Sequence, residues 1–261
     1  MSVLADIKGY VFDLDGCVWR GHALNPGARK LLTALHARGC RLAFISNNSR
    51  ETGAALRVQL HALGVTIAEH VLTPLDILGE AILDRFGPSR VLVIGGPEMG
   101  VVVARSGHEL VAADDYRRAT VVAVGNDFDL DYERLTAASR AVAAGAPLVT
   151  PNLDPRLPVE GGDFLPGCGA IVEAVAVAGG VRPIVIGKPE PPLFRIALER
   201  LGRGADVTAM VGDSVPSDMD GARAVGMRTV LYAPGGAPEH SRADVVVGSF
   251  AELARLLGVG W

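Results

Sequence analysis

Short apolar runs alternate with amphipathic stretches along most of this chain. Eight of these runs have the pattern of buried strands of a parallel sheet, and seven of the eight end in glycine or a polar residue. They lie at residues 10–15, 41–47, 91–96, 121–127, 183–188, 208–214, 228–233 and 244–249. Strands that alternate with helices predict an α/β fold, in which parallel sheets are covered on both faces.

Helix start signals precede three of the amphipathic stretches. An asparagine or threonine followed by proline is typical of an N-cap and a first-turn proline, and Ser-x-x-Glu forms a capping box. The signals are Asn25-Pro26 before residues 27–39, Thr73-Pro74 before residues 75–87, and Ser249 with Glu252 before residues 253–258. We therefore expect helices to begin at these three places.

Composition places the chain among ordinary globular proteins. It has 261 residues, of which 49% are hydrophobic and 21% charged, enough for one large domain or two of usual size. The net charge of −4 favours neither nucleic acid nor an anionic membrane as a partner. The most apolar long stretch, residues 170–187, contains Glu173 and Arg182 and falls short of a membrane span. A cytoplasmic location is therefore expected.

Polar residues collect where the predicted strands end. The four clusters are Asp13 with Asp15, then Ser46, Asn47 and Asn48, then Lys188, and last Asp213 with Asp218. Residues two apart in a strand face the same side, so we expect Asp13 and Asp15 to do so. Ser46 and Lys188 are 142 positions apart, which leaves room for an inserted domain between the second and third clusters.

These residue types fit phosphoryl transfer. Asp13, Asp15 and Asp213 supply the hard oxygen ligands that Mg²⁺ prefers. With a cation present, Asp13 can attack phosphorus as a nucleophile, and Asp15 can protonate the leaving oxygen and later activate water. Ser46, with the groups that follow it, can hold the phosphoryl oxygens, and Lys188 can neutralise their charge.

The same residues resemble a known family. "FDLDGCVWRG", "SNNS", "GKPEP" and "GDSVPSD" are similar to the four ordered motifs of the haloacid-dehalogenase (HAD) superfamily of phosphatases. The large insertion resembles the C2 cap of the NagD-like group, as do the segments at 125–139 and 165–175. The resemblance implies a Rossmann-like parallel-sheet core of residues 1–76 and 183–261, with an inserted α/β C2 cap of residues 77–182.

The resemblance also implies roles for the strand-end residues. Asp13 would be the nucleophile and Asp15 the acid/base. Mg²⁺ would be held by Asp13, Asp213 and the main-chain oxygen of Asp15, and Lys188 and Asp218 would support the site. Ser46, Asn47, Asn48 and Lys188 would bind the phosphate.

Substrates in this group are small phosphorylated metabolites. The candidates are glycerol 3-phosphate, phosphoglycolate, nucleotide monophosphates and 4-nitrophenyl phosphate. The related enzymes often dimerise through the cap, which leaves a homodimer open for this chain. No nucleic-acid or membrane partner is implied.

Loops of the predicted cap are expected to select the substrate. We expect Asp127, Asn152, Asp154 and Arg156 to face the leaving group. The segment "VTPNLDPRLP" departs from the group's usual pattern, and this affects the identity of the substrate, not the reaction.

Rival activities explain the residues less well. A halide-removing enzyme of the same superfamily has no use for Asp15, Asp213 and a metal. A phosphomutase typically carries a smaller helical cap soon after the first motif, where this chain has space for one helix and one strand. A dinucleotide-binding dehydrogenase is disfavoured because Pro97 replaces the middle glycine of its fingerprint. A non-catalytic small-molecule binder on the HAD fold remains as the alternative, although a binder needs no nucleophile.

Overall fold

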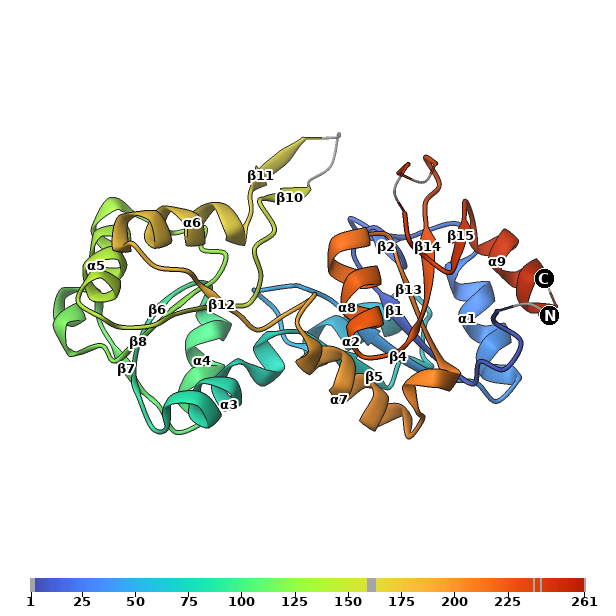
Figure 1. The fold of residues 1–261 in the computed structure, drawn as a ribbon, viewed down its shortest axis with the longest axis horizontal. Coiled ribbons are helices and arrows are strands. Elements are labelled where there is room, and N and C mark those ends of the chain that lie inside the picture. Colours follow the sequence, from blue (N-terminus) through green and yellow to red (C-terminus); the bar gives the residue numbers. More distant parts are fainter. Residues whose placement is uncertain (1–2, 159–162, 237, 240, 261) are drawn as a thin grey trace. The chain divides into compact units, whose positions relative to one another are not determined.

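The computed structural model describes residues 3–158, 163–236, 238–239 and 241–260. Two compact units divide the chain. The first contains residues 1–46, 53–72 and 188–261, and the second contains residues 47–52 and 73–187. Each unit has its own parallel sheet (Figure 1), so the α/β fold class predicted from the alternation is confirmed.

The first unit is built on a six-stranded parallel sheet with the order β15-β14-β13-β1-β4-β5. Its strands are β1 (Gly9–Asp13), β4 (Arg41–Ile45), β5 (His70–Leu72), β13 (Thr208–Gly212), β14 (Arg228–Tyr232) and β15 (Val245–Val247). Its helices are α1 (Ala28–Ala37), α2 (Gly53–Ala62), α7 (Pro191–Leu201), α8 (Asp220–Ala224) and α9 (Phe250–Leu257). A short hairpin of β2 (Trp19–Arg20) and β3 (Ala23–Leu24), a 3₁₀ turn (Ala205–Val207) and a π turn (Val215–Met219) complete the unit.

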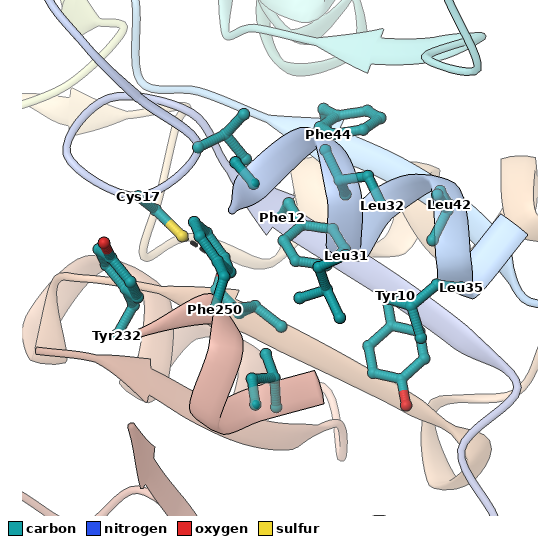
Figure 2. Packing of buried hydrophobic residues seen from close by; sticks show 14 of the residues in the cluster. Tyr10, Phe12, Cys17, Leu31, Leu32, Leu35, Leu42, Phe44, Tyr232 and Phe250 are labelled. Carbon is teal, nitrogen blue, oxygen red and sulfur yellow. Dashed lines mark hydrogen bonds between the residues drawn. The ribbon is translucent and has the colours of Figure 1, made fainter. Parts of the chain in front are cut away.

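The core of the first unit fills the space between the sheet and the helices α1 and α9. These helices come from opposite ends of the chain and lie side by side (Figure 1). Tyr10, Phe12 and Phe44 form a stacked aromatic row on this face, with ring centroids 6.0–6.2 Å apart. Cys17 packs into the same cluster, and its thiol donates to the Val211 carbonyl (Figure 2). Cys17 therefore packs in the core of the unit.

The second unit has a five-stranded parallel sheet with the order β12-β9-β8-β6-β7. Its strands are β6 (Arg90–Ile94), β7 (Glu109–Val111), β8 (Val121–Val124), β9 (Leu148–Thr150) and β12 (Ile184–Val185), beside a separate hairpin of β10 (Arg156–Pro158) and β11 (Phe164–Pro166). Its helices are α3 (Leu75–Phe86), α4 (Pro97–Arg105), α5 (Tyr132–Ala143) and α6 (Cys168–Gly179), with a 3₁₀ turn at Ala113–Arg118. Two buried apolar clusters form its core.

Helices begin at all three predicted places, but two of the predicted N-caps are wrong. Thr73 does not cap α3, whose N-cap is Pro74 with no side-chain bond, and Asn25 does not cap α1. Helix α1 begins at Ala28 with Gly27 as its N-cap, and the φ of Gly27 is +83°, a conformation that favours glycine. Asn25 instead donates from Nδ2 to the carbonyls of Gly16 and Cys17, at 2.9 and 2.6 Å. Its side chain therefore stabilises the loop that follows β1 instead of the helix.

The capping box at the last helix is confirmed. The Ser249 hydroxyl accepts from the Glu252 N–H at 3.1 Å, and the Glu252 carboxylate accepts from the Gly248 N–H at 2.8 Å. Across the described residues, no helix combines the length and the apolar character that crossing a bilayer requires.

Candidate active site

The carboxyl edge of the core sheet gathers residues from distant parts of the chain. Strand β1 lies between β4 and β13, and all three run parallel, so their carboxyl ends meet at one edge. Asp13 is the last residue of β1, Ser46 follows β4, and Asp213 follows β13. Open α/β sheets bind ligands at this edge.

Lys188 joins two of the carboxylates at the site. Its Nζ lies 2.5 Å from Asp13 Oδ1 and 2.7 Å from Asp218 Oδ1, and all three side chains are buried. Burial acts to lower the pKa of Lys188, but the two carboxylates outweigh it and raise that pKa above its ordinary value. The ammonium therefore stays charged, as a buried cation with two partners does.

Asp218 is held in place by the turn that carries it. Its Oδ2 accepts from the Ser214 N–H at 3.1 Å, while its Oδ1 accepts from Lys188. Gly212 leaves space for this carboxylate, since a Cβ there would collide with it. Both oxygens of Asp218 are thus engaged within the site.

Asp13 keeps one oxygen without a partner. Its Oδ2 is buried and accepts no hydrogen bond from any described residue. Burial raises the pKa of Asp13 well above its usual range, Lys188 opposes this, and Asp218 and Asp213 add to it. A buried, unpartnered carboxylate oxygen is costly unless another group binds it.

A cation fits these carboxylates. One carboxylate oxygen from each of Asp13, Asp213 and Asp218 lies within 4.8 Å of the others. Burial, together with the charge of Asp218, raises the pKa of Asp213 to about 6, although Lys188 opposes the shift. At Gly16 a Cβ would collide with the Asp213 carboxylate. Three clustered carboxylates, of which Asp13 and Asp213 have a raised pKa, form a donor set for a hard divalent cation.

The side chain of Asp15 is oriented by contacts other than the strand geometry that was expected to orient it. Strand β1 ends at Asp13, so the alternation of strand side chains does not orient Asp15. Asp15 lies in a turn that Gly16 allows with a φ of +92°. Its carboxylate is exposed, and it accepts from the Ser46 hydroxyl at 2.7 Å and from Trp19 Nε1 at 2.9 Å. Trp19 lies within the first motif, FDLDGCVWRG, but its contact with Asp15 was not predicted because the motif assigned it no role.

The asparagines after Ser46 belong to the second unit, whereas Ser46 belongs to the first. Asn48 Oδ1 accepts from the N–H groups of Arg50 and Glu51, at 2.8 and 2.9 Å, and so caps the turn that follows. The Arg50 guanidinium lies 3.7 Å from the centre of the Phe128 ring. The segment 47–52 is therefore attached to the second unit by its side chains.

Asn152 fixes this segment from another loop. Its Nδ2 donates to the Asn47 carbonyl at 2.6 Å, and its Oδ1 accepts from the Asp154 N–H at 2.9 Å. Asn47 Nδ2 lies 3.5 Å from Asp154 Oδ2. Asn152 is 3% exposed. The structure thus brings Asn152 and Asp154 together with Asn47, and the Asn152 side chain is used inside the unit.

The side chains of Asp127 and Arg156 contact other residues. Asp127 is buried, its Oδ1 accepts from the Asp129 N–H at 3.0 Å, and its Oδ2 is 2.7 Å from Arg134 Nη2. The two atoms form an ion pair, and Oδ2 accepts no hydrogen bond from a described residue. The exposed Arg156 guanidinium lies 4.3 Å from the centre of the Phe164 ring.

Sequence comparison shows that the chain is similar to known phosphatases. The chain is 34% identical over 260 residues to the human glycerol-3-phosphate phosphatase, covering 90% of this chain and 81% of that protein. It is 34% identical over 229 residues to an acid sugar phosphatase of Staphylococcus aureus, covering 87% of each. Family models match as well: a haloacid dehalogenase-like hydrolase model over residues 10–109, and a HAD-hydrolase-like model over residues 185–253.

Solved structures agree with the sequences. The 4-nitrophenylphosphatase of Thermotoga maritima superposes with a TM-score of 0.87 at 28% identity, covering 98% of this chain and all of that one. A glycerol phosphate phosphatase from Mycobacterium tuberculosis, in complex with magnesium, gives 0.84 at 30% identity, covering 97% of this chain and 78% of that one.

Fold, site and relatives define a phosphatase that acts on small phosphate monoesters. The chain belongs to the haloacid dehalogenase-like hydrolase family, in the NagD and 4-nitrophenylphosphatase group with a C2 cap. The resemblance read from the four motifs is confirmed.

Proposed function

We propose that Asp13 is the nucleophile of a two-step hydrolysis. The observation that carries this proposal is the difference between its two oxygens: Oδ1 accepts a hydrogen bond from Lys188, whereas Oδ2 has no hydrogen-bond partner among the described residues. In the first step an Asp13 oxygen forms a bond to phosphorus while the bond from phosphorus to the alcohol oxygen breaks. In the second step water attacks phosphorus and the bond to Asp13 breaks, which releases phosphate.

Asp15 would move the proton in both steps. It protonates the leaving oxygen in the first step and takes a proton from the attacking water in the second. Its exposure allows contact with substrate, and the hydrogen bonds from Ser46 and Trp19 orient it. Lys188 stays protonated and offsets the charge that develops on the phosphoryl oxygens.

The cation in this proposal is Mg²⁺, which the related glycerol phosphate phosphatase structure contains. Asp13, Asp213 and the main-chain oxygen of Asp15 would hold it. Asp218 is a supporting residue, because its oxygens already accept from Lys188 and the Ser214 N–H. When bound, Mg²⁺ neutralises the carboxylates and the phosphoryl group, so that an anionic nucleophile can approach an anionic ester.

The remaining predicted roles form part of the same proposal. Ser46, Asn47 and Asn48 would supply the phosphate-binding segment. Residues 1–76 and 183–261 would act as the catalytic core and residues 77–182 as the cap. A cap of this size excludes water and restricts access, which favours compact substrates.

For the substrate we propose glycerol 3-phosphate or a phosphate ester of similar size. Two relatives are glycerol phosphate phosphatases, and others are acid sugar phosphatases, so a polyol or sugar monophosphate is the chemistry they share. Phosphoglycolate and nucleotide monophosphates are the next candidates, and 4-nitrophenyl phosphate is a generic test substrate.

The test is a panel of these esters with Mg²⁺, measured as phosphate release. We expect turnover that requires Mg²⁺ and ceases in excess EDTA, with glycerol 3-phosphate among the best substrates by kcat/KM. Undiminished turnover in EDTA would overturn the metal proposal. Binding of an ester without any turnover would support instead a non-catalytic small-molecule binder. A ranking led by phosphoglycolate or a nucleotide would revise the substrate and leave the chemistry unchanged.

A further inference from the structure

A cavity of about 600 Å³ opens at the amino-terminal edge of the core sheet. It is lined by residues at the start of β1, in the turn between α1 and β4, and at the end of α9. Its size is that of a small-molecule pocket. The candidate active site lies at the other end of the same strand: Tyr10 faces the cavity, and Asp13 follows three residues later, about 10 Å along the strand.

The wall of this cavity is strongly cationic. Four basic residues line it, from four separate parts of the chain, and among the described lining residues there is no aspartate or glutamate. These residues are Lys8, Arg38, Arg203 and Arg255. Within the described part of the chain none of the four forms an ion pair. Four like charges around one cavity repel one another, and they do so in a chain whose net charge is −4.

Few of the N–H donors on Arg38 and Arg203 form hydrogen bonds within the protein. Arg38 Nη1 donates to the Leu257 carbonyl at 2.7 Å, and Arg203 Nη1 donates to the Gly202 carbonyl at 3.1 Å. A guanidinium has five N–H donors, so most of those on Arg38 and Arg203 remain open to a ligand.

The floor of the cavity holds an unpartnered hydroxyl. Tyr10 is 2% exposed, and its hydroxyl forms no hydrogen bond with a described residue. Figure 2 shows the Tyr10 ring in line with Phe12, with the oxygen directed away from the apolar cluster. The oxygen is not among the fully enclosed unpartnered atoms, so it is open to the cavity. Burial raises the pKa of Tyr10, which keeps the phenol protonated and able to donate.

We propose that this cavity binds a small organic anion with at least two negative charges at one end and an apolar portion beside them. The guanidinium groups of Arg38 and Arg203 would bind the charged end by paired N–H donors. The Tyr10 hydroxyl would donate to the same group, and the apolar side chains Ile7 and Leu35 in the cavity wall would contact the rest of the ligand. The site is separate from the catalytic residues.

Cys40 provides a local reporter of occupancy. It lines the cavity and is partly exposed, whereas Cys17 and Cys168 are buried. The experiment measures the rate of Cys40 alkylation by iodoacetamide, by mass spectrometry of the full chain with Mg²⁺ present. The probe is phenylphosphonate, a dianion that no phosphatase can hydrolyse. We expect it to slow Cys40 alkylation several-fold in a saturable manner. Benzenesulfonate, with the same shape and one charge, should protect less.

Variants locate the effect. Arg203→Ala and Tyr10→Phe should each raise the concentration needed for half-protection, the first by about tenfold for a lost charged contact. Arg57→Ala on α2 removes an exposed arginine outside the cavity and should leave protection unchanged. None of these variants should alter hydrolysis of 4-nitrophenyl phosphate in the absence of phenylphosphonate.

Two results would overturn the proposal. One is the absence of protection by phenylphosphonate in the wild-type chain. The other is that protection does not depend on the site: sodium chloride of matched ionic strength protects Cys40 as well as phenylphosphonate does, or phenylphosphonate protects Arg203→Ala as well as the wild-type chain. Either outcome would reduce the effect to charge screening. Neither result bears on the phosphatase activity, which is measured separately.

Discussion

Asn152 donates a hydrogen bond from Nδ2 to the main-chain carbonyl of Asn47, at 2.6 Å across 105 positions of sequence. Asn152 is buried, and its bond attaches the segment that follows Ser46 to a loop at the end of β9. The Asn152 side chain thus contacts the main chain of the proposed phosphate-binding segment. This differs from the expectation that Asn152 faces the leaving group.

Replacing Asn152 by alanine should therefore affect all substrates alike. We expect Asn152→Ala to lower kcat/KM for glycerol 3-phosphate and for 4-nitrophenyl phosphate by similar factors. It should also reduce the free energy of unfolding by roughly 1–3 kcal/mol, as the loss of a buried hydrogen-bond partner does. Arg156→Ala is the matched control, because Arg156 is exposed and stacks on Phe164. A change of substrate ranking in Asn152→Ala, with stability kept, would contradict this interpretation.

The free oxygen of Asp13 predicts a clean loss of activity in Asp13→Asn. Turnover should fall by at least about 10³-fold, the scale of removing a catalytic nucleophile. The fold should persist, because Lys188 retains Asp218 as a partner and one of several repelling carboxylates is removed. The measurements are phosphate release and thermal unfolding followed by circular dichroism. Near-normal rates would show that another group attacks phosphorus.

The role of Asp15 can be distinguished from that of Ser46, which donates one of the two hydrogen bonds to it. Asp15→Asn should slow turnover by about 10²- to 10⁴-fold through lost acid/base catalysis. The loss should be larger for glycerol 3-phosphate than for 4-nitrophenyl phosphate, since an acidic phenol leaves without a proton. Ser46→Ala removes one of the two bonds and should cost about tenfold. Equal losses for both esters in Asp15→Asn would argue against proton donation by Asp15.

The raised pKa of Asp213 predicts how stability depends on pH when metal is absent. Its pKa lies at about 6 in the folded chain, against 3.8 for an unperturbed carboxyl. The folded state then binds more protons than the unfolded state between these values, so the free energy of unfolding falls as the pH rises through about 4 to 6. Urea unfolding in EDTA across this range is the measurement. Asp213→Asn should flatten the slope, and an unchanged slope would assign it to other groups.

The positions of strand-end residues could be predicted from the sequence because they depend on local patterns. A buried run followed by a polar residue indicates where a parallel strand ends, and this placed Asp13 and Asp213 at one edge of the sheet. Strands β5 and β9 escaped prediction. Each has three residues, and no glycine ends its apolar run as Gly187 and Gly248 do for β12 and β15, which are no longer.

Contacts between distant loops could not be predicted in the same way. The spacing of Asp13 and Asp15 suggested a shared strand face, but a turn at Gly16 and the bonds from Ser46 and Trp19 orient Asp15. Asn25 had the sequence of a cap, and the loop after β1 uses its amide instead. In each case a polar side chain had two available partners, and tertiary structure decided between them.

The central position of β1 has a consequence for hydrogen exchange. All five residues of the strand are buried, and both neighbouring strands are bonded to it. We therefore expect the amides of Phe12 and Asp13 to exchange with solvent only when the whole first unit unfolds. The carboxylate proposed as the nucleophile would thus be attached to the slowest-exchanging part of the backbone, and heat inactivation of the enzyme should follow the melting of this sheet.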